Sequence, residues 1–98
     1  MEELHRKIKI IIFNMWFVYI LKCSDDSNYT GCTNNLNNRI ERHSKGYVSY
    51  TKSRLPIKLV TYIAFPDKYQ AYKFEKYLKS GSGRAFTKRH FLKGLEIL

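Results

Sequence analysis

Five residues spread along the chain have side chains suited to the hydrolysis of a phosphodiester bond: Tyr19, Tyr29, Arg39, His43 and Glu75. Arg39 and His43 lie one turn apart on a predicted helix, so both side chains can point at one place. A guanidinium is always charged and its planar fork suits two phosphate oxygens, whereas an imidazole can move protons near neutral pH. Tyrosine, with an ordinary pKa of about 10, activates water only when nearby positive charge or a metal assists. Glu75 could hold that metal, because Mg²⁺ keeps several waters and needs few protein carboxylates.

Each of these residues also has an ordinary structural explanation. A strand tyrosine is usually part of the core with its hydroxyl at the rim. Glu75 has Lys79 one turn further along, which is a common surface pair on a helix. A helix arginine is normally just solvated, although Arg39 has no acid at helical-neighbour spacing, because Glu41 is two residues on and points elsewhere. His43 alone would more often be a hydrogen-bonded surface or core histidine. What favours a functional interpretation is the joint occurrence of all five, in this order.

Length and charge narrow the class of protein. The chain has 98 residues, which is enough for one hydrophobic core, so we expect a single domain. Its 44% apolar and 15% aromatic residues argue against disorder. Lys and Arg number 18 against 8 Asp and Glu, a formal net charge of +10. Such a field attracts polyanions, so nucleic acid is the expected partner and an anionic lipid surface the alternative.

The apolar run from Ile10 to Leu21 resembles a secretory signal only superficially. It is shorter than the roughly 20 residues that span a bilayer, and no small-residue cleavage site precedes Ser24. Cys23 and Cys32 are the only cysteines, and they do not form a CxxC pair. We therefore expect free thiols, no membrane association and a cytoplasmic location.

Three segments have the composition of β-strands. Trp16 to Cys23 is apolar on both alternating faces, which predicts a central strand covered on two sides. A polar turn at 25–28 leads to a return strand from Tyr29 to Thr33, in which Gly31 would let another backbone or a substrate approach closely. Lys58 to Phe65 alternates well enough to be a third strand.

Three helices complete a predicted ββαβαα order. The first begins after a cap at Thr33, Asn34 or Asn35 and ends before Gly46. Residues 47–56 are expected to form a loop. The second helix starts at Asp67 and runs to about Lys79. Residues 80–83, with the sequence SGSG, are expected to be a turn before a final basic helix over 84–93.

Several segments together resemble the GIY-YIG nuclease superfamily. Within it, the chain is most similar to small stand-alone bacterial members that resemble the nuclease domain of the excision-repair endonuclease. The resemblance covers roughly residues 15 to 93, so we interpret 1–14 as an N-terminal extension and 15–98 as a single nuclease-like domain. The segments that carry it are Phe17-Val18-Tyr19-Ile20-Leu21-Lys22-Cys23, Tyr29-Thr30-Gly31, Arg39-x-x-x-His43, Ser49-Tyr50-Thr51-Lys52 and Glu75-Lys76-Tyr77-Leu78-Lys79.

The resemblance implies an α+β fold in which helices flank a small three-stranded antiparallel sheet. It also implies an endonuclease, of a kind associated with DNA repair, that uses Mg²⁺ or Mn²⁺ to cleave DNA, with RNA or branched structures as alternative substrates. By position, Tyr19 or Tyr29 would act on the water, Arg39 would stabilise the phosphate and Glu75 would bind the metal. His43 stands where members carry histidine or tyrosine.

Basic residues outside this set are candidates for contacts with the nucleic-acid backbone. Lys52 matches a basic residue of the stand-alone subgroup, and we add Arg54, Lys79 and Arg84 to the predicted nucleic-acid-binding residues. The chain shows no second domain that would read a sequence, so we expect low intrinsic specificity unless a partner protein supplies it.

The chain also departs from the family pattern. Phe17 replaces the glycine of the first motif, Thr30 replaces the isoleucine of the second, and Cys32 stands where the repair enzyme has lysine. The asparagine that many members carry on a later helix is not evident, since Thr87 or Lys88 lies near its position. Loss of the lysine removes a cation that could lower a tyrosine pKa. It therefore favours an alternative function, a nucleic-acid-binding module of the same fold with little or no cleavage activity.

Overall fold

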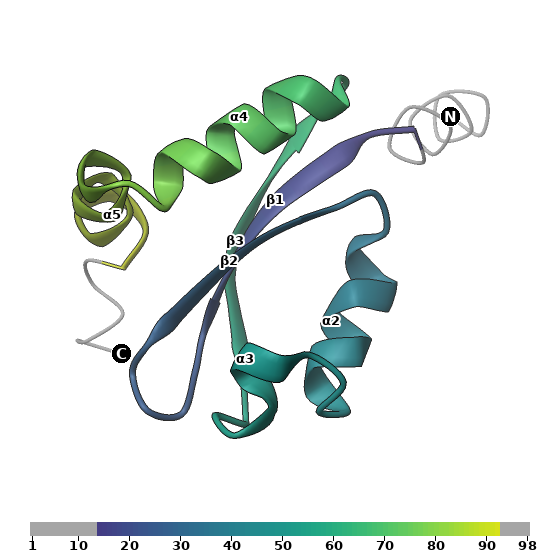
Figure 1. Cartoon of the computed structure of the whole chain (residues 1–98), viewed down its shortest axis with the longest axis vertical. Coiled ribbons are helices and arrows are strands. Elements are labelled where there is room, and N and C mark those ends of the chain that lie inside the picture. The colour runs from purple at the N-terminus through teal and green to yellow at the C-terminus, as the bar shows by residue number, and fades with distance from the viewer. Residues whose placement is uncertain (1–13, 93–98) are drawn as a thin grey trace, which may run out of the picture.

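A three-stranded antiparallel sheet forms the centre of the computed structural model, which describes residues 14–92. The strands lie in the order β2-β1-β3, so the first strand is central as its composition predicts. Figure 1 shows helices on both sides of the sheet, α4 and α5 on one face and α2 and α3 on the other. The strands are β1 (Trp16–Lys22), β2 (Asn28–Thr33) and β3 (Lys58–Phe65). The predicted α+β class and three-stranded sheet are confirmed.

The helices follow the predicted order with two corrections. A short helix, α3, lies within the segment expected to be a loop, and the SGSG segment is not a turn but the cap and first turn of α5. Ser80 caps that helix by accepting a hydrogen bond from the backbone N–H of Gly83, at 3.1 Å. The helices are α2 (Leu36–Ser44), α3 (Ser49–Lys52), α4 (Lys68–Leu78), α5 (Gly81–Thr87) and the π-helical turn η1 (Lys88–Leu92).

Local signals in the sequence position the helix ends. Asn35 and Asp67 cap α2 and α4 by accepting from the backbone N–H of Asn38 and Tyr69, each at 3.1 Å. Gly46 follows α2 with φ of +78°, a left-handed conformation that glycine adopts without strain. These caps fix where each helix meets the sheet.

The hydrophobic core lies between the sheet and α4. Val18 and Ile20 of β1 pack with Ala71 and Leu78 of α4, and all four are essentially buried. Tyr19, between the two strand residues, points to the opposite face because successive strand side chains alternate. The central strand is therefore buried on both faces, with Val18 and Ile20 packed against α4 on one and Phe17, Tyr19 and Leu21 on the other.

Some expectations concern residues that the structure does not describe. The predicted extension, residues 1–14, lies outside the described part except for its last residue, and Lys93 also lies outside it. The division into an extension and one domain stays a prediction. Among residues 14–92, no helix has the length and apolar character needed to cross a membrane.

Candidate active site

The hydroxyl of Tyr19 lies over the edge strand of the sheet and not over its own strand. Tyr19 is fully buried on β1, and its register partner on β2 is Gly31. A Cβ atom at position 31 would collide with the ring and hydroxyl of Tyr19. Gly31 is thus the position of close approach that the sequence predicts, and the group that approaches is a side chain of the neighbouring strand.

A chain of hydrogen bonds leads from Tyr19 into α2 and α3. The Tyr19 hydroxyl and His43 Nε2 are 2.8 Å apart, and His43 Nδ1 and Thr51 Oγ1 are 2.7 Å apart. The Thr51 hydroxyl donates to the carbonyl of Val48 at 3.4 Å, so its oxygen is left to accept a hydrogen bond from the N–H at His43 Nδ1. The imidazole Nε2 then accepts from the Tyr19 hydroxyl. His43 and Thr51 are both fully buried, and nothing in the sequence marks Thr51 as a partner of His43.

Arg39 completes this set from the same face of α2 as His43. Its Nε donates to the Tyr19 hydroxyl at 3.3 Å. This hydrogen bond is the main reason that the pKa of Arg39 is raised, and Tyr29 contributes in the same direction. Arg39 is half-buried, so one side of its guanidinium holds Tyr19 while the rest stays available to a ligand.

Burial sets the protonation states of the two partners of Arg39. Loss of solvent raises the pKa of Tyr19 to about 12, although the hydrogen bond from Arg39 opposes that rise. Burial, and after it the charge of Arg39, lowers the pKa of His43 to about 4. At neutral pH the site therefore holds a neutral phenol, a neutral imidazole and a guanidinium.

Tyr29 is the more accessible tyrosine. Its ring centroid lies 4.8 Å from that of His43 and 6.1 Å from that of Tyr19. It is half-buried, and together with Tyr50 of α3 it lines an open groove. The two tyrosine hydroxyls also interact, because Tyr29 contributes to the raised pKa of Tyr19 through its charge and a hydrogen bond. A ligand in the groove meets Tyr29, with Tyr19 and His43 behind it.

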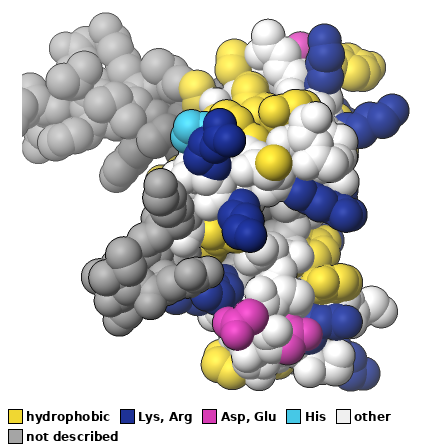
Figure 2. Space-filling model, turned by 90° about the vertical axis from the view of Figure 1, so that its left-hand side faces the viewer, with side chains coloured by type: hydrophobic (Ala, Val, Ile, Leu, Met, Phe, Trp, Pro, Cys, Tyr) yellow, Lys and Arg dark blue, Asp and Glu magenta, His cyan; other side chains and the backbone are white. Residues whose placement is uncertain are grey.

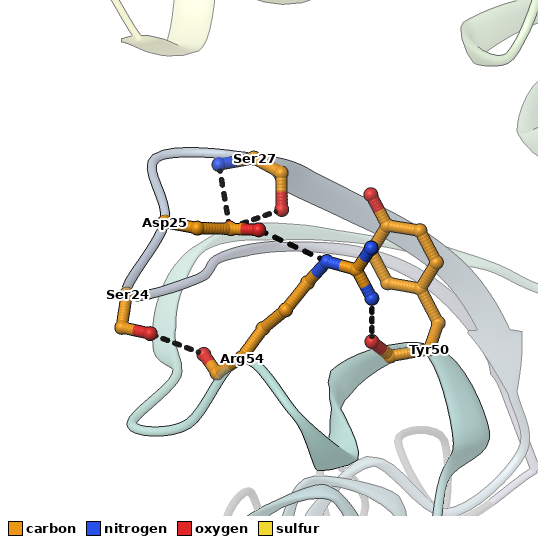
Figure 3. A network of polar contacts seen from close by, with 5 residues as sticks. All are labelled: Ser24, Asp25, Ser27, Tyr50 and Arg54. Atoms are coloured by element: carbon orange, nitrogen blue, oxygen red, sulfur yellow. Dashed lines mark hydrogen bonds and ion pairs between the residues drawn. The ribbon is translucent and has the colours of Figure 1, made fainter.

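Arg54 connects the hairpin turn to α3 (Figure 3). Its Nε donates to Asp25 Oδ2 at 3.0 Å, and its guanidinium also donates to the carbonyl of Tyr50. The same guanidinium lies 4.1 Å from the centroid of the Tyr50 ring, which is 5.6 Å from the ring of Tyr29. The hydroxyl of Ser24 donates to the carbonyl of Arg54 at 3.0 Å. Arg54, predicted from sequence to contact nucleic acid, has its charge engaged within the protein.

Glu75 lies on the other face of the sheet from these residues. Its side chain, 18% exposed, projects from α4 and pairs with Lys79 at 3.5 Å. Its charge, together with burial as the larger cause, raises the pKa of the Cys32 thiol, so the carboxylate lies near that residue. Cys32 follows Gly31 on β2, and adjacent strand residues point to opposite faces. Glu75 therefore lies beside Cys32 and the Tyr19 hydroxyl beside Gly31, so the edge strand β2 separates the two groups.

The donor set near Glu75 suits a hard cation that keeps most of its water. Within residues 14–92 no three His, Cys, Asp or Glu side chains are grouped as a metal cluster. The Cys32 thiol is soft and its raised pKa keeps it protonated, so it is not a ligand for Mg²⁺. A single half-buried carboxylate fits Mg²⁺ or Mn²⁺ only where substrate phosphate oxygens complete the coordination.

The other predicted nucleic-acid-binding residues lie at two places. Lys52 is exposed on α3. Lys79 and Arg84 line the same groove as Tyr29. Two residues with clear structural roles, Thr51 and Tyr50, were not predicted to act in the site, although both belong to the segment Ser49–Lys52 that carries part of the family resemblance.

Comparison with known proteins identifies the family of this chain. The model of the GIY-YIG catalytic domain matches residues 15–89, so the chain belongs to the GIY-YIG nuclease family. Membership in this family implies a nucleic acid as the binding partner.

Among individual proteins, the chain is similar to small proteins named UPF0213. It is 50% identical over 66 residues to the UPF0213 protein CPE1444 of Clostridium perfringens, which covers 66% of this chain and 71% of the relative. It is 42% identical over 79 residues to the UPF0213 protein BH0048 of Halalkalibacterium halodurans, covering 80% and 84%. The solution NMR structure of the UPF0213 protein BH0048 from Bacillus halodurans matches with a TM-score of 0.51 and 38% identity, over 82% of this chain and 86% of that one.

Proposed function

We propose that this protein is a metal-dependent endonuclease that hydrolyses a phosphodiester bond of DNA with low intrinsic sequence specificity. The observation that carries the proposal is the hydrogen-bonded set of Tyr19, His43 and Arg39, with the accessible Tyr29 beside it. Hydrolysis of a phosphodiester is helped by a neutral proton acceptor, a fixed cation and a group that can reach the water. His43, Arg39 and Tyr29 supply these in turn.

In this proposal Tyr29 takes the proton of the attacking water, because it is the tyrosine that a ligand in the groove can reach. The hydroxyl proton of Tyr29 passes to the oxygen of Tyr19, and the Tyr19 proton passes to His43 Nε2 over 2.8 Å. The net result is that the water oxygen bonds to phosphorus and the P–O bond to the leaving oxygen breaks. That oxygen takes the electron pair and accepts a proton from solvent, while the proton of the water leaves an imidazolium at His43. No free phenolate forms, so the raised pKa of Tyr19 does not block the step.

Substrate binding would favour this proton transfer. The positive charge of Arg39 is one cause of the lowered pKa of His43, after burial. A phosphate bound to the free side of Arg39 offsets that charge, so the pKa of His43 rises when substrate is present. Arg39 also stabilises the charge that develops on the phosphate oxygens.

Glu75 is the residue that would hold a Mg²⁺ or Mn²⁺ ion, which when bound supplies Lewis-acid stabilisation of the phosphate and leaving oxygens. Before metal can bind, the ion pair between Glu75 and Lys79 has to open. Lys79 is then free to approach the nucleic acid, so the same exchange places a cation next to the substrate.

Nicking of supercoiled plasmid in Mg²⁺ or Mn²⁺ tests the proposal. Tyr29→Phe and Glu75→Gln are each expected to slow nicking by about 100-fold or more, which is the usual contribution of a general base or a metal ligand. Tyr69→Phe is the matched control, because Tyr69 on α4 is 80% exposed and should leave the rate unchanged. Nicking at the native rate by either site variant would reject the assignment.

A second candidate function is a nucleic-acid-binding module of the same fold with little or no cleavage activity. It is favoured by the neutral Cys32 thiol beside Glu75 and by the high pKa of Tyr19, which burial keeps raised despite the hydrogen bond from Arg39. This module would bind DNA in a salt-sensitive way and show no metal-dependent nicking.

A further inference from the structure

A basic groove lies along the open edge of the sheet. The groove has a volume of about 1370 Å³ and extends from Tyr29 and Thr30 of β2 to α5 and η1. Its lining includes five cations and one acid: Lys22, Lys79, Arg84, Lys88, Arg89 and Asp26. Figure 2 shows the corresponding side of the molecule, on which Lys and Arg side chains gather between acidic side chains at the lower end and at the top.

The charge of the groove is concentrated where α5 meets η1. Asp26 pairs with Lys22 at 3.7 Å, so that acid is neutralised locally. Arg84, Lys88 and Arg89 form no ion pair within residues 14–92. These three cations on consecutive turns therefore form an uncompensated site for anions.

Thr87 provides an independent sign of a ligand at the same place. It lies in the groove lining between Arg84 and Lys88, is 6% exposed, and its hydroxyl has no hydrogen-bond partner among the described residues. A valine would fill the same volume without the cost of burying an unpaired hydroxyl. The helix also changes to a π-turn immediately after Thr87, a change that is frequent at functional sites.

We infer that this groove is a second phosphate-binding site, which takes a backbone phosphate of the nucleic acid at a distance from the bond that is cleaved. Arg84, Lys88 and Arg89 supply the positive charge. The Thr87 hydroxyl is buried as the structure stands, and it donates to a phosphate oxygen once its side chain rotates towards the groove. The inference rests on the proposed function only in taking nucleic acid as the ligand.

The position of the groove explains how residues on opposite faces of the sheet could act on one substrate. Its lining includes Tyr29 on one face and Leu78 and Lys79, at the end of the helix that carries Glu75, on the other. A strand anchored at α5 that runs to Tyr29 crosses the open edge of β2. It is then presented both to the Tyr19, His43 and Arg39 set and to Glu75.

Binding of fluorescein-labelled DNA, measured by anisotropy over a range of salt concentrations without divalent metal, tests the groove. The variant Arg84→Ala/Lys88→Ala should bind about tenfold more weakly. The slope of log affinity against log salt should become less steep, by the amount expected for the loss of roughly two phosphate contacts. The control is Lys73→Ala/Lys76→Ala, which removes the same charge from exposed residues of α4 outside the groove. Equal losses in both variants would mean a general charge effect and would overturn the inference.

Thr87→Val tests the hydroxyl separately. Because the Thr87 hydroxyl has no partner among the described residues, the melting temperature should stay the same or rise, whereas DNA affinity should fall several-fold. Native affinity in this variant would exclude the hydroxyl as a ligand.

The two proposals can fail independently of each other. If the native chain does not nick plasmid but the groove variants lose DNA binding, the nuclease proposal fails and the phosphate site stands. If the native chain nicks plasmid and the groove variants bind like the control, the nuclease stands and the phosphate site is rejected.

Discussion

His43 combines the roles of a structural and a chemical residue. It accepts from Tyr19, donates to Thr51, and is buried close to the charge of Arg39. Burial and the charge of Arg39 favour the neutral imidazole, which is the form that can accept a proton from Tyr19. A histidine on a helix is usually exposed, so its function follows from burial and partners and not from its residue type.

The lowered pKa of His43 should make folding stability depend on pH in the acid range. The pKa is about 6.5 in the unfolded chain and about 4 in the fold, so the unfolded state binds the proton first. Stability should be fully present above pH 6.5 and should fall by up to about 3 kcal/mol as the pH drops towards 4. Urea denaturation at pH 7 and pH 4.5 measures this difference.

The matched variants for this measurement are His43→Gln and His90→Gln. His90 is exposed, so its replacement should leave the pH dependence as in the native chain. His43→Gln should remove most of the dependence between pH 6.5 and 4. Asp25 and Glu41 also have lowered pKa values and lose their partners in acid, but they do so equally in both variants. The hypothesis is wrong if His43→Gln keeps the native slope.

Between elements, the contact from the hairpin turn to α3 passes through Arg54. This residue holds Asp25 on one side and the ring of Tyr50 on the other (Figure 3). The ring of Tyr50 in turn packs on that of Tyr29. Arg54 therefore acts on the candidate site through two aromatic side chains. An arginine that binds phosphate would instead have a free guanidinium.

Replacement of Arg54 by Leu distinguishes positioning from phosphate binding. We expect the nicking rate at saturating DNA to fall several-fold, because Tyr50 no longer holds Tyr29 in place, while DNA affinity changes less than twofold. Lys52→Ala should show the reverse pattern, since Lys52 is exposed and has no ion pair among the described residues. A loss of affinity without a loss of rate in Arg54→Leu would restore its predicted role as a nucleic-acid contact.

The packing of α5 on α4 depends on one glycine of the SGSG segment. A Cβ atom at Gly83 would collide with the backbone of Tyr77 and Leu78, which cannot move away as a flexible side chain could. Gly83→Ala should therefore lower the free energy of unfolding by about 1–3 kcal/mol or more, as overpacking does. Chemical denaturation measures the change.

Gly81 is the control within the same segment. A Cβ atom there meets nothing within 4 Å, and alanine has a higher helix propensity than glycine by up to about 1 kcal/mol. Gly81→Ala should be neutral or stabilising. Similar destabilisation by both substitutions would mean that α5 tolerates no change in the backbone freedom of this segment, and that the close approach is not the cause.

For the molecule as a whole, the edge strand β2 is where the charges and the chemistry meet. Tyr19, His43 and Arg39 lie on one face of the sheet, Glu75 lies on the other, and the basic groove runs along the open edge between them. The net charge of +10 attracts a polyanion to any part of the surface. Because its lining includes both basic residues and Tyr29, the groove would hold a bound polyanion next to Tyr29.

Residue patterns were sufficient to predict most of the secondary structure, the α+β class and the family of this protein. Strand alternation, helix caps such as Asn35 and Asp67, and the glycine at 46 act within a few residues of one another, so they can be read locally. The two errors, the short helix α3 and the start of α5 at Gly81, arose because the local composition of both segments favours loops.

Which residues work together became evident from the three-dimensional arrangement alone. Three features depend on segments that are separate in the sequence: the full burial of Tyr19 beside a half-buried Tyr29, the hydrogen bond of His43 with Thr51, and the engagement of Arg54 by Asp25. The position of Glu75 depends on strand register, since Gly31 and Cys32 are neighbours in sequence but face opposite sides of the sheet. Register and helix packing are set by the whole core, and for that reason residue types and spacing alone do not give them.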